Sequence, residues 1–373
     1  MHLNLTDLQA DVQARARALA AEHILPRAAQ YDKEARFPAE QVRALGAGGF
    51  LSMLVPKADG GGGLGPICYS LAVTEVAQAC ASSAVTMAVT NMVGDAISAW
   101  GSDELKQRYI PRLASADYLA GSFCLSEADA GSDAASLTAT AEKRGDKYIL
   151  NGSKCWITSG DVAGVLLVMA KTDKEAGARG ISAFLVEPGM KGFSVGRHEE
   201  KMGLRASSTV TINLEDVEVP EANRLGPEGV GFKIAMRALD GGRIGVGSQA
   251  LGIGLAALGS LTTYLKGQAS LPAGAEAKLA DTVTELEAAR MMVLRAAYLK
   301  DTAQTFTREA SMAKLYATEA ANRSCQRAQE IMGPAGWTDA YSAERHFRDV
   351  RVTTIYEGTS EVQRIVIARQ VLA

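Results

Sequence analysis

The sequence predicts a multidomain α+β protein in which a β domain lies between two helical domains. Its 373 residues suggest about two to three domains. Apolar residues recur with helical spacing up to about residue 118 and again from about 227, whereas short β-rich runs fill the part between. Because the strands are grouped and do not alternate with helices, a doubly wound sheet is not expected. We therefore predict an N-terminal helical domain over 1–118, a central β domain over 119–226 and a C-terminal helical domain over 227–373.

The N-terminal part is predicted to be helical and not to be a targeting or membrane segment. Charges interrupt the apolar residues of 1–24, and Thr6 with Gln9 forms a capping-box pattern, so an amphipathic helix is expected there. Two uncharged stretches, 76–94 and 244–265, are long enough to cross a bilayer. Polar residues and glycines interrupt both, which favours buried helices of a helical bundle.

The central part is predicted to be a largely antiparallel β unit. The runs that we expect to be strands are 148–150, 155–158, 165–170, 181–186 and 209–214. Asn151-Gly152 and Pro188-Gly189 are typical turn pairs, and we expect them to separate strands.

The overall composition excludes several classes of protein. Lys and Arg number 39 and Asp and Glu 42, giving a net charge of −3, which argues against nucleic-acid binding. The five cysteines are scattered and never spaced C-x-x-C, which favours free thiols in a reducing compartment, here the cytoplasm. Four histidines give no pattern for a metal site.

One motif resembles a dinucleotide site without its context. The run Gly245-Val246-Gly247-Ser248-Gln249-Ala250 matches G-x-G-x-x-A, but the residues before it have a helical pattern. No acid follows Asp240 before Glu276, so the carboxylate that would bind the ribose is missing. We expect a helix at this position.

Two segments of the central part have candidate binding residues. Residues 123–133 form a strand end followed by a polar turn, whose amides could hold a phosphate or a heterocycle edge, or which could be an ordinary acidic turn. Residues 150–158 place Trp156 and Thr158 on a strand, where a core tryptophan is the alternative.

Two further segments lie in the C-terminal part. Asp240 and Arg243 are three residues apart and could form a helix-surface pair or bind the polar part of an extended ligand. Ser360 and Gln363 suggest a capping box for a last helix, whose N-terminus could receive a pyrophosphate. Glu357 precedes that helix, and a desolvated carboxylate there could be a base with a raised pKa, although a lone loop Glu is more often solvated.

Taken together, the motifs closely resemble the acyl-CoA dehydrogenase family, and specifically its short-chain (butyryl-type) branch. The segments that carry the resemblance over the whole chain read F-C-L-S-E-x-x-A-G-S-D, N-G-x-K-x-W-I-T, E-K-M-G-L-R-x-S-S, A-E-R-H-x-R-D and I-Y-E-G-T-S-E-V-Q-R. The resemblance implies an N-terminal helical domain, a central β-barrel and a C-terminal four-helix bundle. It also implies bound FAD, a homo-oligomer built as a dimer of dimers, and an electron-transfer flavoprotein as acceptor.

The resemblance further implies a reaction and the residues that take part in it. Glu357 would remove the α-proton of a short-chain acyl-CoA while flavin N5 takes the β-hydride. Residues implied in cofactor binding are Phe123, Leu125, Ser126, Gly131, Ser132, Trp156, Ile157, Thr158, Glu330, Gly333, Thr359, Ser360 and Glu361. Residues implied in substrate binding are Ser132, Asp240, Arg243, Tyr356 and Gly358.

Some positions depart from the family pattern. Gly242 occupies the position from which some relatives supply the base. No Arg or Phe lies between Arg243 and Arg290, so the family's R-x-x-F-G is missing, and Glu330 and Pro334 alter its Q-x-L-G-G. Weaker FAD binding is therefore expected.

Two alternatives to a dehydrogenase of acyl-CoA stay open. The acyl group could be carried by a carrier protein, or the chain could be a partner subunit of a heteromeric dehydrogenase.

Overall fold

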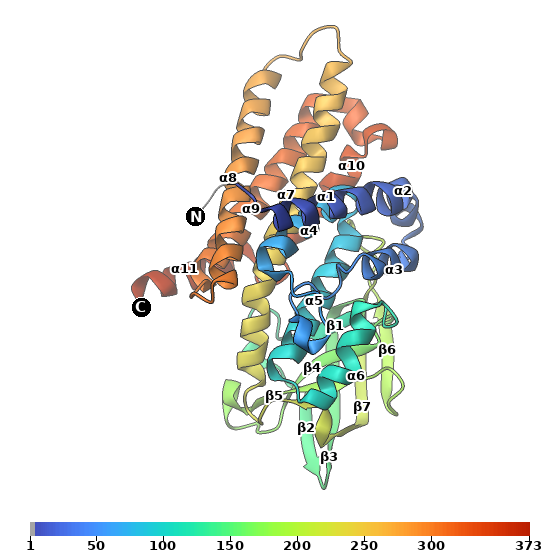
Figure 1. Cartoon of the computed structure of the whole chain (residues 1–373), viewed down its shortest axis with the longest axis vertical. Coiled ribbons are helices and arrows are strands. Elements are labelled where there is room, and N and C mark those ends of the chain that lie inside the picture. Colours follow the sequence, from blue (N-terminus) through green and yellow to red (C-terminus); the bar gives the residue numbers. More distant parts are fainter. Residues whose placement is uncertain (1–3) are drawn as a thin grey trace.

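A computed structural model of the chain describes residues 4–373 and shows helices at both ends of the sequence with a sheet between them. The C-terminal helices form one end of the molecule and the strands form the other, with the N-terminal helices between them (Figure 1). The residues before position 4, where the first predicted helical segment begins, lie outside the described residues.

The N-terminal helices are α1 (Asp7–Leu19), α2 (Leu25–Glu34), α3 (Ala39–Ala47), α4 (Gly65–Ala79), α5 (Ala81–Trp100) and α6 (Asp103–Ala114). A short π-helical turn over Ala20–Ile24 joins α1 to α2. The predicted capping box is confirmed, because the Thr6 side chain accepts from the Gln9 backbone and the Gln9 side chain accepts from the Thr6 backbone. The uncharged stretch 76–94 is divided between two helices, since Cys80 is extended and ends α4.

The strands are β1 (Gly121–Cys124), β2 (Thr140–Arg144), β3 (Lys147–Thr158), β4 (Val165–Lys171), β5 (Ile181–Val186), β6 (Phe193–His198), β7 (Thr209–Pro220) and β8 (Arg224–Leu225). They form one eight-stranded sheet in the order β6-β7-β3-β2-β4-β5-β8, and β1 pairs with β4. Most pairs are antiparallel, as predicted, but β1 and β2 lie parallel to β4.

The prediction that Asn151-Gly152 separates two strands is wrong. Both residues lie inside β3, at an irregularity in its pairing with β7. A Cβ on Gly152 would lie 2.7 Å from the Cβ of Ala139, so close packing and not a reversal of the chain requires the glycine. The Asn151 amide donates to Asp216 on the neighbouring strand at 2.9 Å.

The C-terminal helices are α7 (Gly231–Lys266), α8 (Ala275–Asp301), α9 (Thr307–Met332), α10 (Ala343–Val350) and α11 (Ser360–Leu372). Helix α7 runs almost the length of the molecule (Figure 1) and packs against α4, α5, α8 and α9. It is long and apolar enough to cross a membrane, yet 72% of its most apolar window is buried within the protein. The G-x-G-x-x-A run lies inside this helix, and helical residues 231–244 directly precede it, which confirms that it is not a dinucleotide loop.

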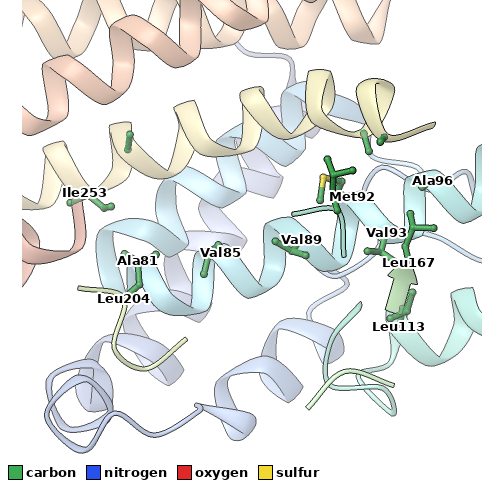
Figure 2. Packing of buried hydrophobic residues seen from close by; sticks show 14 of the residues in the cluster. Ala81, Val85, Val89, Met92, Val93, Ala96, Leu113, Leu167, Leu204 and Ile253 are labelled. Atoms are coloured by element: carbon green, nitrogen blue, oxygen red, sulfur yellow. The ribbon is translucent and has the colours of Figure 1, made fainter. Parts of the chain in front are cut away.

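Helix α5 is the element around which the three parts of the chain share a core. Its buried face, from Ala81 to Ala96, packs with residues from α6, β4, the loop before β7, and α7 (Figure 2). The residues that these elements contribute are Leu113, Leu167, Leu204 and Ile253. Because helices and sheet share this core, the segments that surround α7 are held in fixed relation to one another.

Candidate active site

Glu357 lies in a strained turn immediately before α11. Its φ is 53° and that of Gly358 is 93°, so two successive residues are left-handed. The residue is half-buried, but its Oε2 atom is buried and has no hydrogen-bond partner among the described residues. Burial raises the pKa of Glu357 to about 7, although the charges of Lys314 and Arg243 lower it. The sequence-based prediction of a desolvated carboxylate is consistent with this environment.

The Glu357 carboxylate lies directly against the backbone of α7. A Cβ placed on Gly242 would be 1.8 Å from Glu357 Oε2, which no real pair of atoms tolerates. Position 242 and the Glu357 side chain therefore occupy the same space. With the Glu357 carboxylate in this position there is no room for a side chain at 242.

Asp240 and Arg243 pair with each other, but not on the surface of the protein. Arg243 is buried and its Nη1 donates to Asp240 at 2.6 Å and to Ser311 at 3.1 Å. Asp240 also accepts from Thr307 at 2.7 Å, so the pair joins α7 to α9. The two residues flank Gly242 in the sequence, and the Arg243 charge acts on the candidate base.

The buried Tyr69 and the half-buried Tyr356 complete the surroundings of Glu357. The Tyr356 hydroxyl donates to Gln249, and the Tyr69 hydroxyl lies against Gly245 of α7. Burial and the nearby Glu357 charge raise the pKa of both phenols. Tyr69 and Gln249 were not among the predicted site residues, because single tyrosines and glutamines on apolar helices give no chemical signal in a sequence.

Lys314 is a further group that the sequence reasoning missed. It is fully buried on α9, and its Nζ donates to the carbonyl of Gly358 at 2.8 Å. One feature of the sequence could have indicated this residue: a lysine stands within a stripe of small residues. Ala310, Ala313 and Ala317 of this stripe are buried on the same helix.

The structure brings together the two segments predicted to bind a flavin. The backbone N–H of Cys155 donates to Ser126 at 2.9 Å, and Lys154 Nζ donates to Leu125 at 3.2 Å and to the Glu127 carboxylate at 2.7 Å. Lys154 is fully buried. This buried ion pair fixes the end of β1 against the second half of β3.

Trp156 is presented outward from that half of β3. Its side chain is 63% exposed and its backbone is left-handed, with φ 60°. The core alternative for Trp156 is therefore wrong. A large aromatic face held outward on a strained backbone suits a planar ligand, and this supports FAD binding beside the Ser126 segment.

The remaining residues of these two segments differ in accessibility. Gly131 and Ser132 are exposed on the turn, Phe123, Ser126 and Thr158 are half-buried, and Leu125 is buried. Ile157 is 1% exposed and packs inside the sheet. Ile157 can therefore reach a ligand only through its backbone.

The capping box predicted for the last helix is wrong by one residue. Thr359 is the N-cap, because it is extended and its hydroxyl accepts from the Val362 backbone at 3.3 Å. Ser360 is buried and donates to Glu319 at 2.7 Å. Gln363 donates to the carbonyls of Glu357 and Gly358 at 3.3 and 2.9 Å, and so holds the turn that presents Glu357.

The other predicted cofactor residues divide between two places. Glu361 is exposed on the first turn of α11, near Glu357. Glu330 and Gly333 lie at the far end of α9, about 24 Å along the helix from Lys314 at ~1.5 Å per residue. Glu330 pairs with Lys278 at 2.7 Å, and Gly333 ends α9 with φ 54°. The structure does not bring these two residues to the Glu357 site within one chain.

Known proteins share this arrangement over the whole chain. Three domain profiles match in order: the acyl-CoA dehydrogenase N-terminal domain over residues 6–117, the middle domain over 122–217 and the C-terminal domain over 229–372. The chain belongs to the acyl-CoA dehydrogenase family. The family is one of oxidoreductases, and its three-domain architecture is the one described above.

Among acyl-CoA dehydrogenases, relatives named for short-chain substrates are prominent. The mitochondrial short-chain specific acyl-CoA dehydrogenase of Bos taurus is 45% identical over 95% of this chain and 88% of its own length. The butyryl-CoA dehydrogenase structure from Megasphaera elsdenii covers both chains fully, with 38% identity and a TM-score of 0.96. A chain from a structure titled for the electron transferring flavoprotein of Acidaminococcus fermentans gives 40% identity and a TM-score of 0.97, again over both full chains.

Proposed function

We propose that this protein is an FAD-dependent dehydrogenase that converts a short-chain acyl-CoA to its trans-2-enoyl-CoA, with Glu357 as the base. The observation that carries the proposal is the Glu357 carboxylate itself. Its Oε2 is buried, has no partner among residues 4–373 and lies against Gly242 of α7. The names of the short-chain and butyryl-CoA relatives support the substrate class.

Glu357 has the properties that a base needs for this reaction. Its task is to take the α-proton of the thioester, and a base is most effective when its pKa lies near the working pH. Burial brings the pKa of Glu357 to about 7. The bound acyl chain would exclude more water and strengthen every electrostatic interaction in the site. We expect the backbone N–H of Glu357 to donate to the thioester oxygen, as the family resemblance implies.

FAD is supported by the residues that face its expected position. Trp156 offers an exposed aromatic face, and the Ser126 segment and Thr158 lie on the same part of the sheet. Thr359 and Glu361 would approach the cofactor from the start of α11. Bound FAD supplies the acceptor for the β-hydride. Asp240 and Arg243 would orient the CoA arm beside Glu357.

We also propose that the protein is a homo-oligomer that passes its electrons to an electron-transfer flavoprotein. Exposed apolar side chains gather on the C-terminal helices, at Met312 of α9 and at Ile365, Val371 and Leu372 of α11. Such a set favours burial against another protein surface. Sedimentation of the pure protein would test the proposed homo-oligomer, and a monomer at micromolar concentration would contradict it.

The decisive experiment follows the flavin absorbance of the purified protein under anaerobic conditions. Butyryl-CoA should bleach the flavin, and the same acyl group on a carrier protein should do so far more slowly. Glu357→Gln should still bind flavin and substrate but bleach about 10² to 10⁴-fold more slowly, because the base is lost. Bleaching only by the carrier-protein thioester would assign a carrier-protein substrate. A flavin-free and inactive protein would assign a partner-subunit role.

A further inference from the structure

Lys314 is a buried cation for which the reaction proposed above assigns no role. It is fully buried on α9 among small residues, and its hydrogen bond to Gly358 joins it to the turn that presents Glu357. Burying an ammonium group that no ion pair neutralises is unfavourable, so lysine is not the residue that packing alone would select here. An uncharged side chain would fill the same space at a lower cost.

The turn that Lys314 contacts needs support from outside. Glu357 is a non-glycine residue with φ 53°, a conformation that persists only where surrounding contacts impose it. Two donors meet at the Gly358 carbonyl: Lys314 Nζ at 2.8 Å and Gln363 Nε2 at 2.9 Å. One donor is charged and the other is neutral, so the two residues allow position and charge to be tested separately.

The charges around Glu357 point to Lys314 as the uncompensated cation. The ionisable groups that interact electrostatically with the carboxylate are Arg243 from α7, Lys314 from α9, Tyr69 from α4 and the adjacent Tyr356. Arg243 is already neutralised by its 2.6 Å pair with Asp240.

Three other carboxylates act on this set from further out. Asp95 acts on Tyr69, while Glu319 and Glu361 act on Lys314. Glu361 is exposed and Glu319 already accepts from Ser360, so neither neutralises Lys314 as Asp240 neutralises Arg243.

We infer that Lys314 is a positioning residue for the proposed reaction: it clamps the Glu357–Gly358 turn and its charge keeps the Glu357 carboxylate in the proton-accepting form. The two groups act on each other through space and not through a hydrogen bond. A direct ion pair would hold the carboxylate too firmly ionised to be a good base, whereas a cation one peptide away offsets only part of the effect of burial. Burial lowers the pKa of Lys314 to about 8, so it remains charged where the base works.

The test compares the pH dependence of flavin reduction by butyryl-CoA in single-turnover experiments on the holoenzyme. On the acidic side of the pH–rate profile, the rate falls as Glu357 becomes protonated. In Lys314→Met this acidic limb should move to higher pH by about one unit or more, since a nearby charge shifts a carboxyl pKa by ~1–3 units. The rate should recover as the pH is raised. Lys314→Gln keeps a donor without the charge and should show the same movement, and Lys314→Arg should restore the wild-type limb.

Gln363→Met is the matched control, because it removes the neutral donor from the same carbonyl. It should lower the rate at every pH without moving the limb. An unmoved limb in both Lys314→Met and Lys314→Gln, or an equal movement in Gln363→Met, would overturn the inference.

Infrared difference spectra give a readout that needs no turnover. The C=O stretch of protonated Glu357, identified by its loss in Glu357→Gln, should persist to higher pH in Lys314→Met than in the wild type. This measurement separates the two proposals. A wild-type protein that butyryl-CoA does not reduce would overturn the proposed function, while the infrared titration would still decide whether Lys314 controls the protonation of Glu357.

Discussion

At the scale of single residues, the site depends on the close approach of one side chain to one backbone. The Glu357 carboxylate reaches α7 only because residue 242 has no Cβ. Glycine inside a helix is unfavourable by roughly 1 kcal/mol relative to alanine, so packing against Glu357 explains a residue that helix propensity disfavours.

Gly242→Ala should therefore impair catalysis without a change of chemical group. The new Cβ would lie 1.8 Å from Glu357 Oε2, so the carboxylate must move by an ångström or more. A displacement of that size costs on the order of 10²-fold in rate. Gly259→Ala on the same helix is the control, because a Cβ there meets nothing within 4 Å. Stopped-flow flavin reduction measures both, and equal rates in the two variants would contradict the prediction.

At the scale of elements, the buried pair of Glu127 and Lys154 holds β1 against β3. Burial alone would raise the pKa of Glu127, but the hydrogen bond and charge of Lys154 outweigh it and the pKa is lowered. Glu127 also accepts from Thr138 and Ala139 at 2.6 and 3.0 Å, so both halves of the pair are tied into the sheet. The pair thereby sets the spacing of the segments that carry Ser126 and Trp156.

Lys154→Met should destabilise the protein and weaken its hold on FAD. Removing one partner of a buried pair leaves an uncompensated charge and costs about 3–5 kcal/mol. Lys147→Met, at the exposed start of the same strand, breaks only a surface pair with Glu218 and should cost less than ~1 kcal/mol. Urea denaturation and FAD titration would measure both variants. A loss of stability in Lys154→Met no larger than in Lys147→Met would show that the pair has no special role.

At the scale of the whole molecule, α10 connects the helical and sheet regions through buried groups that titrate in opposite directions. Burial raises the pKa of Asp349 to about 6, so its contribution to stability falls as the pH rises from about 3.8 to about 6. Burial lowers the pKa of His346 to about 3, so its contribution falls as the pH drops from about 6.5 to about 3. The two effects oppose each other over most of this range.

Asp349→Asn should reveal the effect of His346 on the pH dependence of stability, because the opposing effect of Asp349 is removed. The amide oxygen can still accept from the Leu204 backbone, as Asp349 does at 2.6 Å, but the buried charge is gone. We expect a higher melting temperature at pH 7.5 and a steeper decrease between pH 6 and pH 5 than in the wild type. Melting curves at these three pH values provide the check, and parallel pH profiles for the two proteins would refute the assignment.

The second whole-molecule prediction concerns retention of the cofactor. Residues 267–274 form a loop between α7 and α8, where the resemblance implies an R-x-x-F-G segment that this sequence lacks. Glu330 is an acid where the resemblance implies a neutral amide, so it would repel a nearby pyrophosphate, and moderate salt weakens the remaining exposed ionic contacts. Dialysis against moderate salt should therefore remove FAD, and Glu330→Gln should retain more of it than the control Glu276→Gln. Nanomolar retention by the wild type would contradict this.

The residues that the sequence predicted correctly are those whose signal is local. The Thr6 capping box, the helical G-x-G-x-x-A run and the grouped strands each follow from neighbours in the chain. The errors arise where distant segments decide. Asn151-Gly152 lies inside β3, where Ala139 leaves no room for a side chain at 152, and Lys314 becomes part of the site because α9 contacts the Glu357 turn.

The space shared by residue 242 and the Glu357 side chain also constrains how such a site can evolve. The resemblance implies that some relatives carry the base on this helix, at the position of Gly242. In this protein an acid gained at 242 first would collide with Glu357, and Glu357 lost first would leave no base. Each order of single substitutions is therefore expected to pass through an impaired enzyme. A glycine at 242 and an acid at 357 are therefore expected to change together.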